Sequence, residues 1–204
     1  MRSVKQKILD TACGLFLTRG FKSVTMDDLS DYMGISKKTI YAHFENKTDL
    51  VAQCTMYLFN RISGGIDFIC TQGLDPIEEL YEIKKFAMNH LKNEKASPVY
   101  QLKKYYPPIF EKLQQKQFEV MKECVRENVT RGIDRGIYRP NLNVDFVARI
   151  YFTGITSLKD DNLFPQDLFS KADLVDMYLE YHLRGIVTPK GRMKLNTIIN
   201  SNQN

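Results

Sequence analysis

The stretch "GISKKTIYAHFENKTDL", residues 34–50, contains a turn, a short helix and the start of another helix. Gly34 ends a preceding helix that Thr25 opens, and the turn "GIS" separates that helix from the next. Ser36 is a favourable N-cap for a helix that runs to about Phe44. Two short helices joined by so few residues have the spacing of a helix-turn-helix, whose second helix lies in the major groove of DNA.

The helix that begins after Ser36 has two chemically distinct sides. At about 100° per residue, Ile40 and Phe44 fall close together and form the side that we expect to be buried. The opposite side and its flanks carry polar or small side chains: Lys37, Lys38, Thr39, Tyr41, Ala42 and His43. This pattern is hard to explain as a core helix.

These residue types suit contact with a DNA duplex. Lysines reach guanine acceptors or phosphates, a threonine hydroxyl donates to phosphate, and alanine permits close approach to a thymine methyl. The alternative is that Lys37 and Lys38 are only a solvated helix start, but lysine is disfavoured there because the N-terminal end of the helix dipole is positive. We therefore interpret the helix as a DNA reader. The predicted DNA-binding residues are Thr25, Ser36, Lys37, Lys38, Thr39, Tyr41, Ala42, His43 and Lys47.

Helical periodicity extends through almost the whole chain, and sustained strand-type alternation is absent. The fold class is therefore expected to be all-α. Glycines, prolines and caps divide the chain into about nine helices. They are expected near residues 4–19, 25–33, 36–44, 47–71, 75–94, 97–105, 108–136, 143–159 and 170–186, followed by a frayed, polar tail at 188–204.

Composition bounds the class of protein without deciding its function. The chain has 204 residues, 43% of them hydrophobic, so it can bury a sizeable core. Its net charge of +5 is not concentrated, because residues 1–60 hold eight lysines and arginines against six acidic residues. Global charge therefore does not demonstrate nucleic-acid binding, and the argument rests on local geometry.

The cysteines and the hydropathy indicate a cytoplasmic protein. Four cysteines lie far apart, with no CxxC pair, within apolar periodic stretches, and we expect them to be reduced and buried. The N-terminal stretch "MRSVKQKILDTACGLF" lacks a signal-peptide core, and no apolar run approaches the roughly 20 residues of a membrane span.

The segment "ILDTACGLFLTRGFKSVTMDDLSDYMGISKKTIYAHFENKTDL", residues 8–50, resembles the N-terminal DNA-binding domain of TetR-family transcriptional regulators. The most specific parts are Gly20-Phe21, Thr25, Gly34-Ile35-Ser36, Thr39-Ile40-Tyr41-x-His43-Phe44 and Lys47-x-x-Leu50. One feature departs from the pattern of some members: Asp27 and Asp28 follow the cap of the second helix, where a basic, base-contacting residue is found in those relatives.

The resemblance implies a bacterial, homodimeric repressor that binds double-stranded DNA at a palindromic operator. It implies a DNA-binding domain at residues 1–46 and a ligand-binding and dimerisation domain at 47–187. Lys37, Lys38, Thr39, Tyr41 and His43 would face the operator, and Thr25 and Lys47 would contact phosphates. An unknown small-molecule effector would release the DNA, and no cofactor or metal is implied.

Two sets of side chains are candidates for the effector pocket and the dimer interface. Irregular, aromatic-rich helices between bundle elements can leave a ligand cavity, although an aromatic stripe is more often plain core. The pocket candidates are Phe86, Tyr100, Tyr105, Tyr106, Phe110, Phe118 and Tyr151. The helix expected at 170–186 has an apolar side wider than packing against the core of one chain requires. This width favours burial against a partner over packing within the chain. The interface candidates are Phe152, Leu174, Met177, Tyr178 and Tyr181.

The stretch "RISGGIDF" inserts Ser63, Gly64 and Gly65 into the helix after the DNA-binding segment. Each glycine destabilises a helix interior by about 1 kcal/mol relative to alanine, and Gly/Ser pairs are common kink sites. A hinge that transmits effector binding to the DNA-reading helices is one hypothesis. Close helix packing or an early helix end is the alternative.

The sequence argues against an enzyme. Three histidines are present, His43, His90 and His182, and no GxxxxGK or GxSxG motif or metal-ligand spacing accompanies them. A helical ligand-binding or adaptor protein without DNA affinity remains the other alternative, and a DNA-binding measurement separates it from a regulator.

Overall fold

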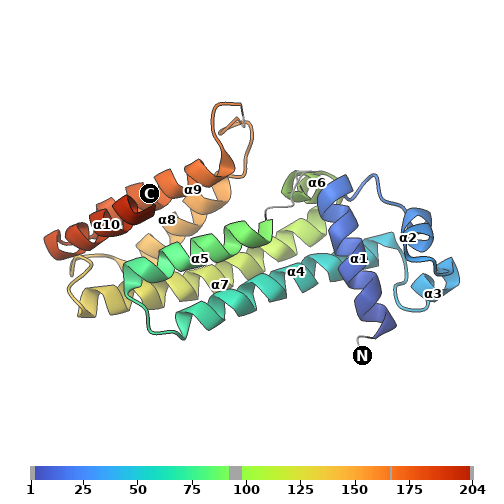
Figure 1. Cartoon of the computed structure of the whole chain (residues 1–204), viewed down its shortest axis with the longest axis horizontal. Coiled ribbons are helices and arrows are strands. Elements are labelled where there is room, and N and C mark those ends of the chain that lie inside the picture. The colour runs from blue at the N-terminus through green and yellow to red at the C-terminus, as the bar shows by residue number, and fades with distance from the viewer. Residues whose placement is uncertain (1–2, 92–97, 166, 203–204) are drawn as a thin grey trace. The chain divides into compact units, whose positions relative to one another are not determined.

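The computed structural model describes residues 3–91, 98–165 and 167–202, and within them it is built from ten α-helices (Figure 1). In those ranges the sole strand-like pairing is an isolated antiparallel bridge between Tyr138 and Val187. The all-α expectation is confirmed. The helices are α1 (Val4–Arg19), α2 (Met26–Met33), α3 (Lys37–Tyr41), α4 (Lys47–Cys70), α5 (Pro76–Leu91), α6 (Pro98–Tyr105), α7 (Pro107–Asp134), α8 (Val144–Ser157), α9 (Lys171–Ile186) and α10 (Pro189–Asn202).

Most expected helix boundaries fall within a few residues of the observed ones, because the caps act as expected. Ser3 caps α1 by accepting a hydrogen bond from Gln6 N at 3.2 Å, and Gly20 ends that helix with φ 88°. Residues 92–94 and 97, expected to be helical, lie outside the described residues. One boundary was placed too late: α3 ends at Tyr41, because a tightened turn follows in which the amides of His43 and Phe44 both donate to Ile40 O.

The expected frayed tail is wrong, because residues 189–202 form α10. Pro189 stands in the first turn, where its missing amide is harmless, and Gly191 N donates to Thr188 Oγ1 at 3.2 Å. Leu195 is fully buried, and Ile198 and Ile199 pack against the same core. These three apolar side chains have helical spacing, although most residues of the segment are polar. A prediction from composition alone therefore missed the helix.

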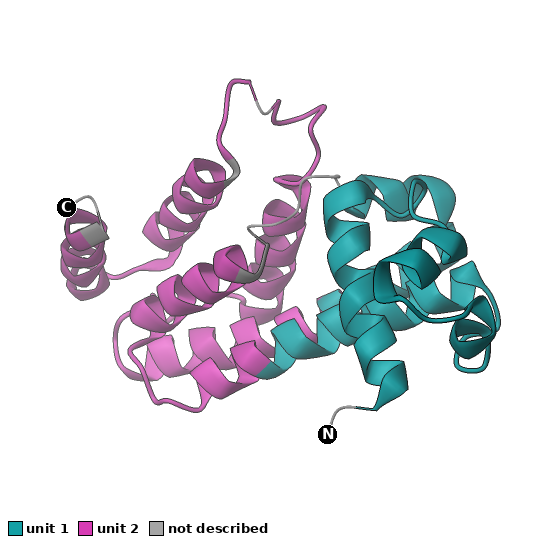
Figure 2. Ribbon diagram, turned by 45° about the vertical axis from the view of Figure 1, so that its right-hand side comes forward, with its two compact units in different colours: residues 1–64, 90–117 teal, residues 65–89, 118–204 magenta. Residues whose placement is uncertain are grey.

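The chain divides into two compact units, and α4 and α7 each contribute residues to both (Figure 2). Unit 1 comprises residues 1–64 and 90–117. Its core joins α1, α2, α3 and the start of α4 to Leu102 of α6 and Leu113 of α7. Gln101 accepts a hydrogen bond from Lys22 N at 3.2 Å, and the Phe21 and Tyr106 rings meet edge to face at 6.2 Å. The first three helices of unit 1 therefore pack on α6 and α7 as well as on one another.

Unit 2 comprises residues 65–89 and 118–204, and a polar network crosses its apolar core. Glu79 and Asn128 are fully buried, and the Asn128 amide donates to Glu79 Oε1 at 2.8 Å. Arg131 Nη2 donates to both Glu79 oxygens at 2.5 and 2.6 Å, and the buried Tyr138 hydroxyl donates to Asn128 Oδ1 at 3.1 Å. Since an unpaired buried charge is strongly destabilising, these bonds tie α5 to α7.

The cysteines are free thiols, but they are less uniformly buried than expected. Cys13 and Cys54 lie in the unit 1 core, whereas Cys70 and Cys124 in unit 2 are only half-buried. Among the described residues, no helix is long and apolar enough to cross a membrane.

Candidate nucleic-acid interface

The turn between α2 and α3 is held by the residues that end one helix and start the next. Gly34 adopts the left-handed conformation, φ 63° and ψ 33°, which a glycine tolerates without steric cost. Ile35 N donates to Ser30 O at 3.2 Å, and the buried Ser30 hydroxyl donates to Ile35 O at 2.6 Å. Ser30 therefore stabilises the turn through two hydrogen bonds on its buried side. Sequence reasoning missed it, because a serine in mid-helix has no signature of such a bond.

The buried side of α3 is as the helical wheel predicts, whereas Thr39, expected on the opposite side, is half-buried. Ile40 and Phe44 are 0% and 1% exposed and belong to the unit 1 core. Of the predicted DNA-binding residues, Thr39 and Lys47 are half-buried, and the exposed ones are Thr25, Ser36, Lys37, Lys38, Tyr41, Ala42 and His43. The structure thus presents a polar surface on a short, anchored helix.

Both cap hydroxyls are already engaged. Thr25 forms a complete capping box, since its Oγ1 accepts from Asp28 N at 3.0 Å and donates to Asp28 Oδ2 at 2.8 Å. Hydrogen bonds from the Thr25 amide and then the Thr25 hydroxyl lower the pKa of Asp28. Ser36 Oγ accepts from Thr39 N at 3.1 Å and lies 2.9 Å from the Thr39 hydroxyl. These side chains primarily fix the helix starts, and any phosphate contact competes with those bonds.

Asp27 on α2 forms an ion pair with Lys37 on α3. The Lys37 Nζ and Asp27 Oδ1 atoms are 2.5 Å apart, and both side chains are more than half exposed. The hydrogen bond to Asp27 raises the pKa of Lys37. An exposed pair of this kind stabilises the fold little, but it places a carboxylate on the surface that would approach phosphates.

Lys47 is held at the start of α4. Its ammonium donates to Lys22 O at 3.2 Å, and burial lowers its pKa. The bond ties α4 to the segment between α1 and α2, where the Lys22 ammonium lies 5.2 Å from the Tyr105 ring centroid. Since an ammonium has three donors, Lys47 keeps the capacity for a further contact.

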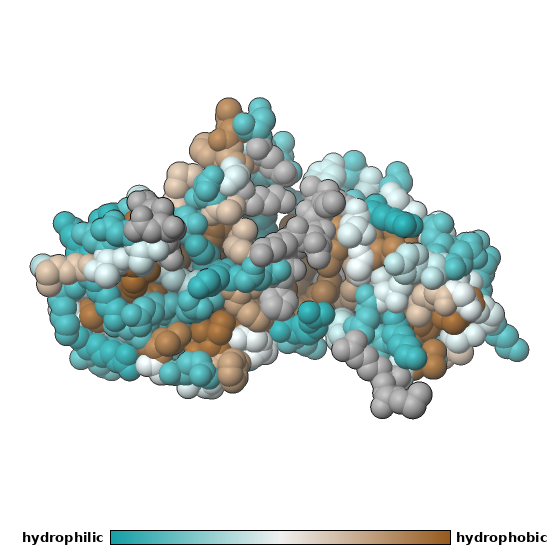
Figure 3. All heavy atoms as spheres, in the orientation of Figure 1, coloured by the Kyte–Doolittle hydropathy of each residue, from teal (hydrophilic) through white to brown (hydrophobic). Residues whose placement is uncertain are grey.

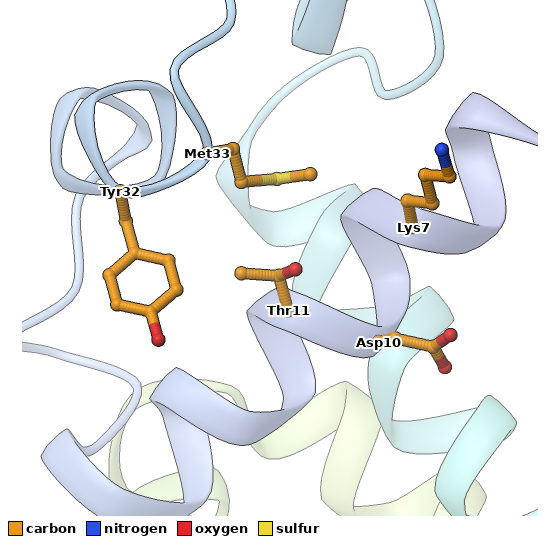
Figure 4. A pocket seen from close by; sticks show the side chains of 5 residues that line it. All are labelled: Lys7, Asp10, Thr11, Tyr32 and Met33. Atoms are coloured by element: carbon orange, nitrogen blue, oxygen red, sulfur yellow. The ribbon is translucent and has the colours of Figure 1, made fainter.

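A shallow hollow of about 470 Å³ opens between α1 and α2. Lys7, Asp10 and Thr11 come from α1, and Tyr32 and Met33 come from α2 (Figure 4). None of the residues proposed for the effector pocket lines it.

Those pocket candidates are divided between the two units. Tyr100, Tyr105, Tyr106 and Phe110 belong to unit 1, where Tyr100 is exposed and Tyr106 and Phe110 pack on the core. Phe86, Phe118 and Tyr151 belong to unit 2. The Phe118 ring meets the Phe152 ring at 5.1 Å, and Tyr151 is buried in the core. Their role in effector binding stays a prediction.

The helices α8 and α9 expose apolar side chains one turn apart. On α9 Met177 and Tyr181 are 49% and 78% exposed, and on α8 Phe146 and Ile150 are 62% and 47% exposed. The Tyr178 hydroxyl donates to Ile150 O and Tyr151 O at 3.0 Å, which fixes the two helices together, while Leu174 is buried. Phe146 and Ile150 were absent from the sequence-based interface set.

Figure 3 also shows hydrophobic residues over the segment between α8 and α9, where Leu163 and Leu168 are exposed.

The helix α4 continues through Gly64 and Gly65. A Cβ atom at Gly65 would lie 2.0 Å from Phe86 Cζ, whereas one at Gly64 would meet nothing within 4 Å. Close packing therefore accounts for Gly65, and the role of Gly64 stays a hypothesis.

Residues 8–54 match the family model described as "Bacterial regulatory proteins, tetR family", a span that covers most of α1, all of α2 and α3, and the start of α4. The chain is 26% identical over 193 residues to the HTH-type transcriptional repressor KstR2 of Mycolicibacterium smegmatis, with 93% of each chain covered.

Solved structures share the fold over nearly the whole chain. SmeT, the repressor of the Stenotrophomonas maltophilia multidrug efflux pump SmeDEF, superposes with a TM-score of 0.72 at 16% identity, covering 92% of each chain. A transcriptional regulator from Saccharomonospora viridis in complex with choline has a TM-score of 0.72 at 20% identity, covering 90% of this chain and 97% of that one. Residues 8–54 therefore match the tetR family of bacterial regulatory proteins in sequence, and nearly the whole chain shares the fold of solved transcriptional regulators.

Proposed function

We propose that this protein is a homodimeric repressor that reads a palindromic operator through α3 and leaves it when a small molecule binds the body of the molecule. Residues 1–46 form the DNA-binding domain, and residues 47–187 bind the effector and the second copy. The protein acts in the cytoplasm, where bacterial DNA lies. The observation that carries this proposal is the polar, lysine-bearing side of α3, held outward by the buried Ile40 and Phe44.

In this proposal Lys38, Ala42 and the flanking Tyr41 meet the bases or the groove edge. His43 and Lys47 contact phosphates, together with Thr25, Ser36 and Thr39 at the helix starts. Two copies of α3 are needed because five helical residues read only part of a site, and a dimer with twofold symmetry requires a palindrome.

Release requires that the effector bind the DNA-free arrangement of the dimer more tightly than the DNA-bound one, since equal affinity shifts nothing. A related fold that holds choline supports the idea that this architecture accommodates a small molecule. The aromatic candidates in both units, from Phe86 to Tyr151, are the side chains to probe first.

Lys38→Ala is expected to weaken operator binding about 30-fold, which corresponds to about 1 kcal/mol for each of two copies. The operator is first identified by selecting bound genomic fragments, and its dissociation constant is then measured by fluorescence anisotropy over a salt series. If Lys38 contacts phosphate, the slope of log affinity against log salt also becomes shallower by about one for each copy.

Lys85→Ala is the matched control for this measurement, because Lys85 is 69% exposed on α5 in unit 2 and its removal changes the net charge equally. It should leave the affinity unchanged. Failure of the native protein to bind any fragment at low salt would reject the proposed function in favour of a helical adaptor.

Asp27→Asn is expected to strengthen operator binding by about three- to tenfold. The change keeps the shape of the side chain, frees the Lys37 ammonium and removes a negative charge near phosphates. The measurement is the same anisotropy titration at two salt concentrations, with the larger gain at low salt. Glu82→Gln, which breaks the exposed Lys85–Glu82 pair of unit 2, is the control and should have no effect. A loss of affinity in Asp27→Asn would instead identify Asp27 as the residue that orients Lys37 for binding.

A further inference from the structure

Two cysteine sulfurs meet in unit 2, although 54 positions separate them in the chain. Cys70 is the last residue of α4, Cys124 lies in the middle of α7, and their Sγ atoms are 3.4 Å apart. Both side chains are half-buried. The other two thiols, Cys13 and Cys54, also contact each other, but both are buried in the unit 1 core. Cys13 Sγ donates to Cys54 O at 3.8 Å and Cys54 Sγ donates to Leu9 O at 3.9 Å, and the contact with Cys13, together with burial, raises the pKa of Cys54.

The surroundings give the two sulfurs different roles. A hydrogen bond from the Cys124 thiol lowers the pKa of Cys70, and the nearby positive charge of Arg131 lowers it further, while burial and Glu79 oppose the shift. The same hydrogen bond and burial raise the pKa of Cys124. Cys70 is therefore the sulfur that becomes a thiolate first, and the thiolate is the nucleophilic form.

Cys70 is also accessible. It lines a hollow of about 320 Å³ together with Arg126, Glu127, Thr130 and Arg131. Two of these residues are cationic, and Arg131 is fixed by its two bonds to the buried Glu79. A small, uncharged oxidant can reach the sulfur from this side without any opening of the core.

We propose that Cys70 and Cys124 form a site oxidised by hydroperoxides, at which the chain closes an intramolecular disulfide. After Cys70 gives its proton to solvent, its sulfur attacks the terminal oxygen of the hydroperoxide. A sulfur–oxygen bond forms, the oxygen–oxygen bond breaks, and the alkoxide or hydroxide that leaves takes a proton from solvent. The product at Cys70 is a sulfenic acid.

The second step joins the sulfurs. Cys124 gives its proton to solvent and attacks the Cys70 sulfur, so that the disulfide forms, the sulfur–oxygen bond breaks, and hydroxide leaves as water. In total, two thiols lose two electrons and form one disulfide. One hydroperoxide is reduced to an alcohol, or to water if it is hydrogen peroxide, and a second molecule of water is released. The sulfurs must approach by about 1.4 Å to reach the disulfide distance of about 2.05 Å. The crosslink would join the end of α4 to α7, and a thiol reductant would reverse it.

The test uses the purified, reduced full-length protein and hydrogen peroxide. After free thiols are blocked by alkylation, non-reducing peptide mapping by mass spectrometry should show one disulfide for each chain, between the peptides of Cys70 and Cys124. Cys13 and Cys54 should remain alkylatable after denaturation, and Cys70 should react about tenfold faster than either of them. Dithiothreitol should restore four thiols.

Two variants separate the roles, and a third is the matched control. In Cys124→Ser the sulfenic acid at Cys70 has no resolving thiol, so dimedone should label Cys70. In Cys70→Ser neither disulfide nor dimedone adduct should form. Cys13→Ser, the same exchange at a buried site, should form the Cys70–Cys124 crosslink as the native chain does. The proposal is overturned if the native protein forms no such crosslink, forms it only between chains, or carries the dimedone adduct on another cysteine.

Discussion

Tyr181→Asp is expected to leave the protein monomeric and to weaken operator binding by about 1,000-fold. Tyr181 is 78% exposed on α9, one turn after the half-exposed Met177, and the neighbouring helix α8 exposes Phe146 and Ile150. Burial of these apolar side chains against a second copy is favourable in proportion to the apolar area buried. A carboxylate at position 181 would remove part of that area and would itself have to lose its hydration in the interface, which is unfavourable. A monomer holds only one half-site, so it loses the gain from linking two binding events.

The measurement combines light scattering coupled to size-exclusion chromatography with the anisotropy titration on the selected operator. Phe68→Asp is the matched control, because Phe68 is 66% exposed on α4 in unit 2 but lies on neither α8 nor α9. It should remain dimeric and bind the operator normally. A dimeric Tyr181→Asp variant with native affinity would place the interface elsewhere.

Glu79→Ala is expected to lower the free energy of unfolding by about 3–5 kcal/mol. Glu79 is fully buried and accepts two hydrogen bonds from Arg131 and one from Asn128. Without the Glu79 carboxylate, the Arg131 guanidinium and the Asn128 amide lose an acceptor. Removing one partner of such a pair is strongly destabilising, because the other partner is left uncompensated.

Urea unfolding followed by circular dichroism at a fixed protein concentration checks this result, because the stability of the proposed dimer would depend on concentration. Glu78→Ala provides a stringent control, because the neighbouring Glu78 is 45% exposed and pairs with Lys194 at 3.3 Å. That variant should lose less than about 1 kcal/mol. Equal losses in the two variants would show that the buried network does not stabilise unit 2 as argued.

The parts of the molecule that sequence predicts well are those governed by local rules. Ser3, Thr25 and Ser36 cap their helices as expected, because N-capping depends on a side chain and an amide three residues away. The burial of Ile40 and Phe44 follows from helical periodicity alone. These rules sufficed to identify the helix-turn-helix and its exposed side.

The missed features depend on contacts between residues far apart in sequence. No local pattern pairs Glu79 with Arg131, or Cys70 with Cys124, because α5 and α4 meet α7 only in the folded unit. The ion pair of Asp27 and Lys37 depends on the angle between two helices. The same limit applies to the effector candidates, whose aromatic spacing predicts burial but not the presence of a cavity around them.

If α3 reads the operator as proposed, its short length limits the number of base pairs that it can contact. Five residues at about 1.5 Å each extend about 7.5 Å, which is about two base-pair steps of 3.4 Å along the duplex. Each half-site therefore supplies only a few bits of direct sequence information, too few to single out one locus in a genome. The remaining discrimination has to come from the spacing of the two half-sites and from how readily the intervening DNA takes the required shape. We expect operator variants that alter half-site spacing by one base pair to be rejected more strongly than single base changes within a half-site.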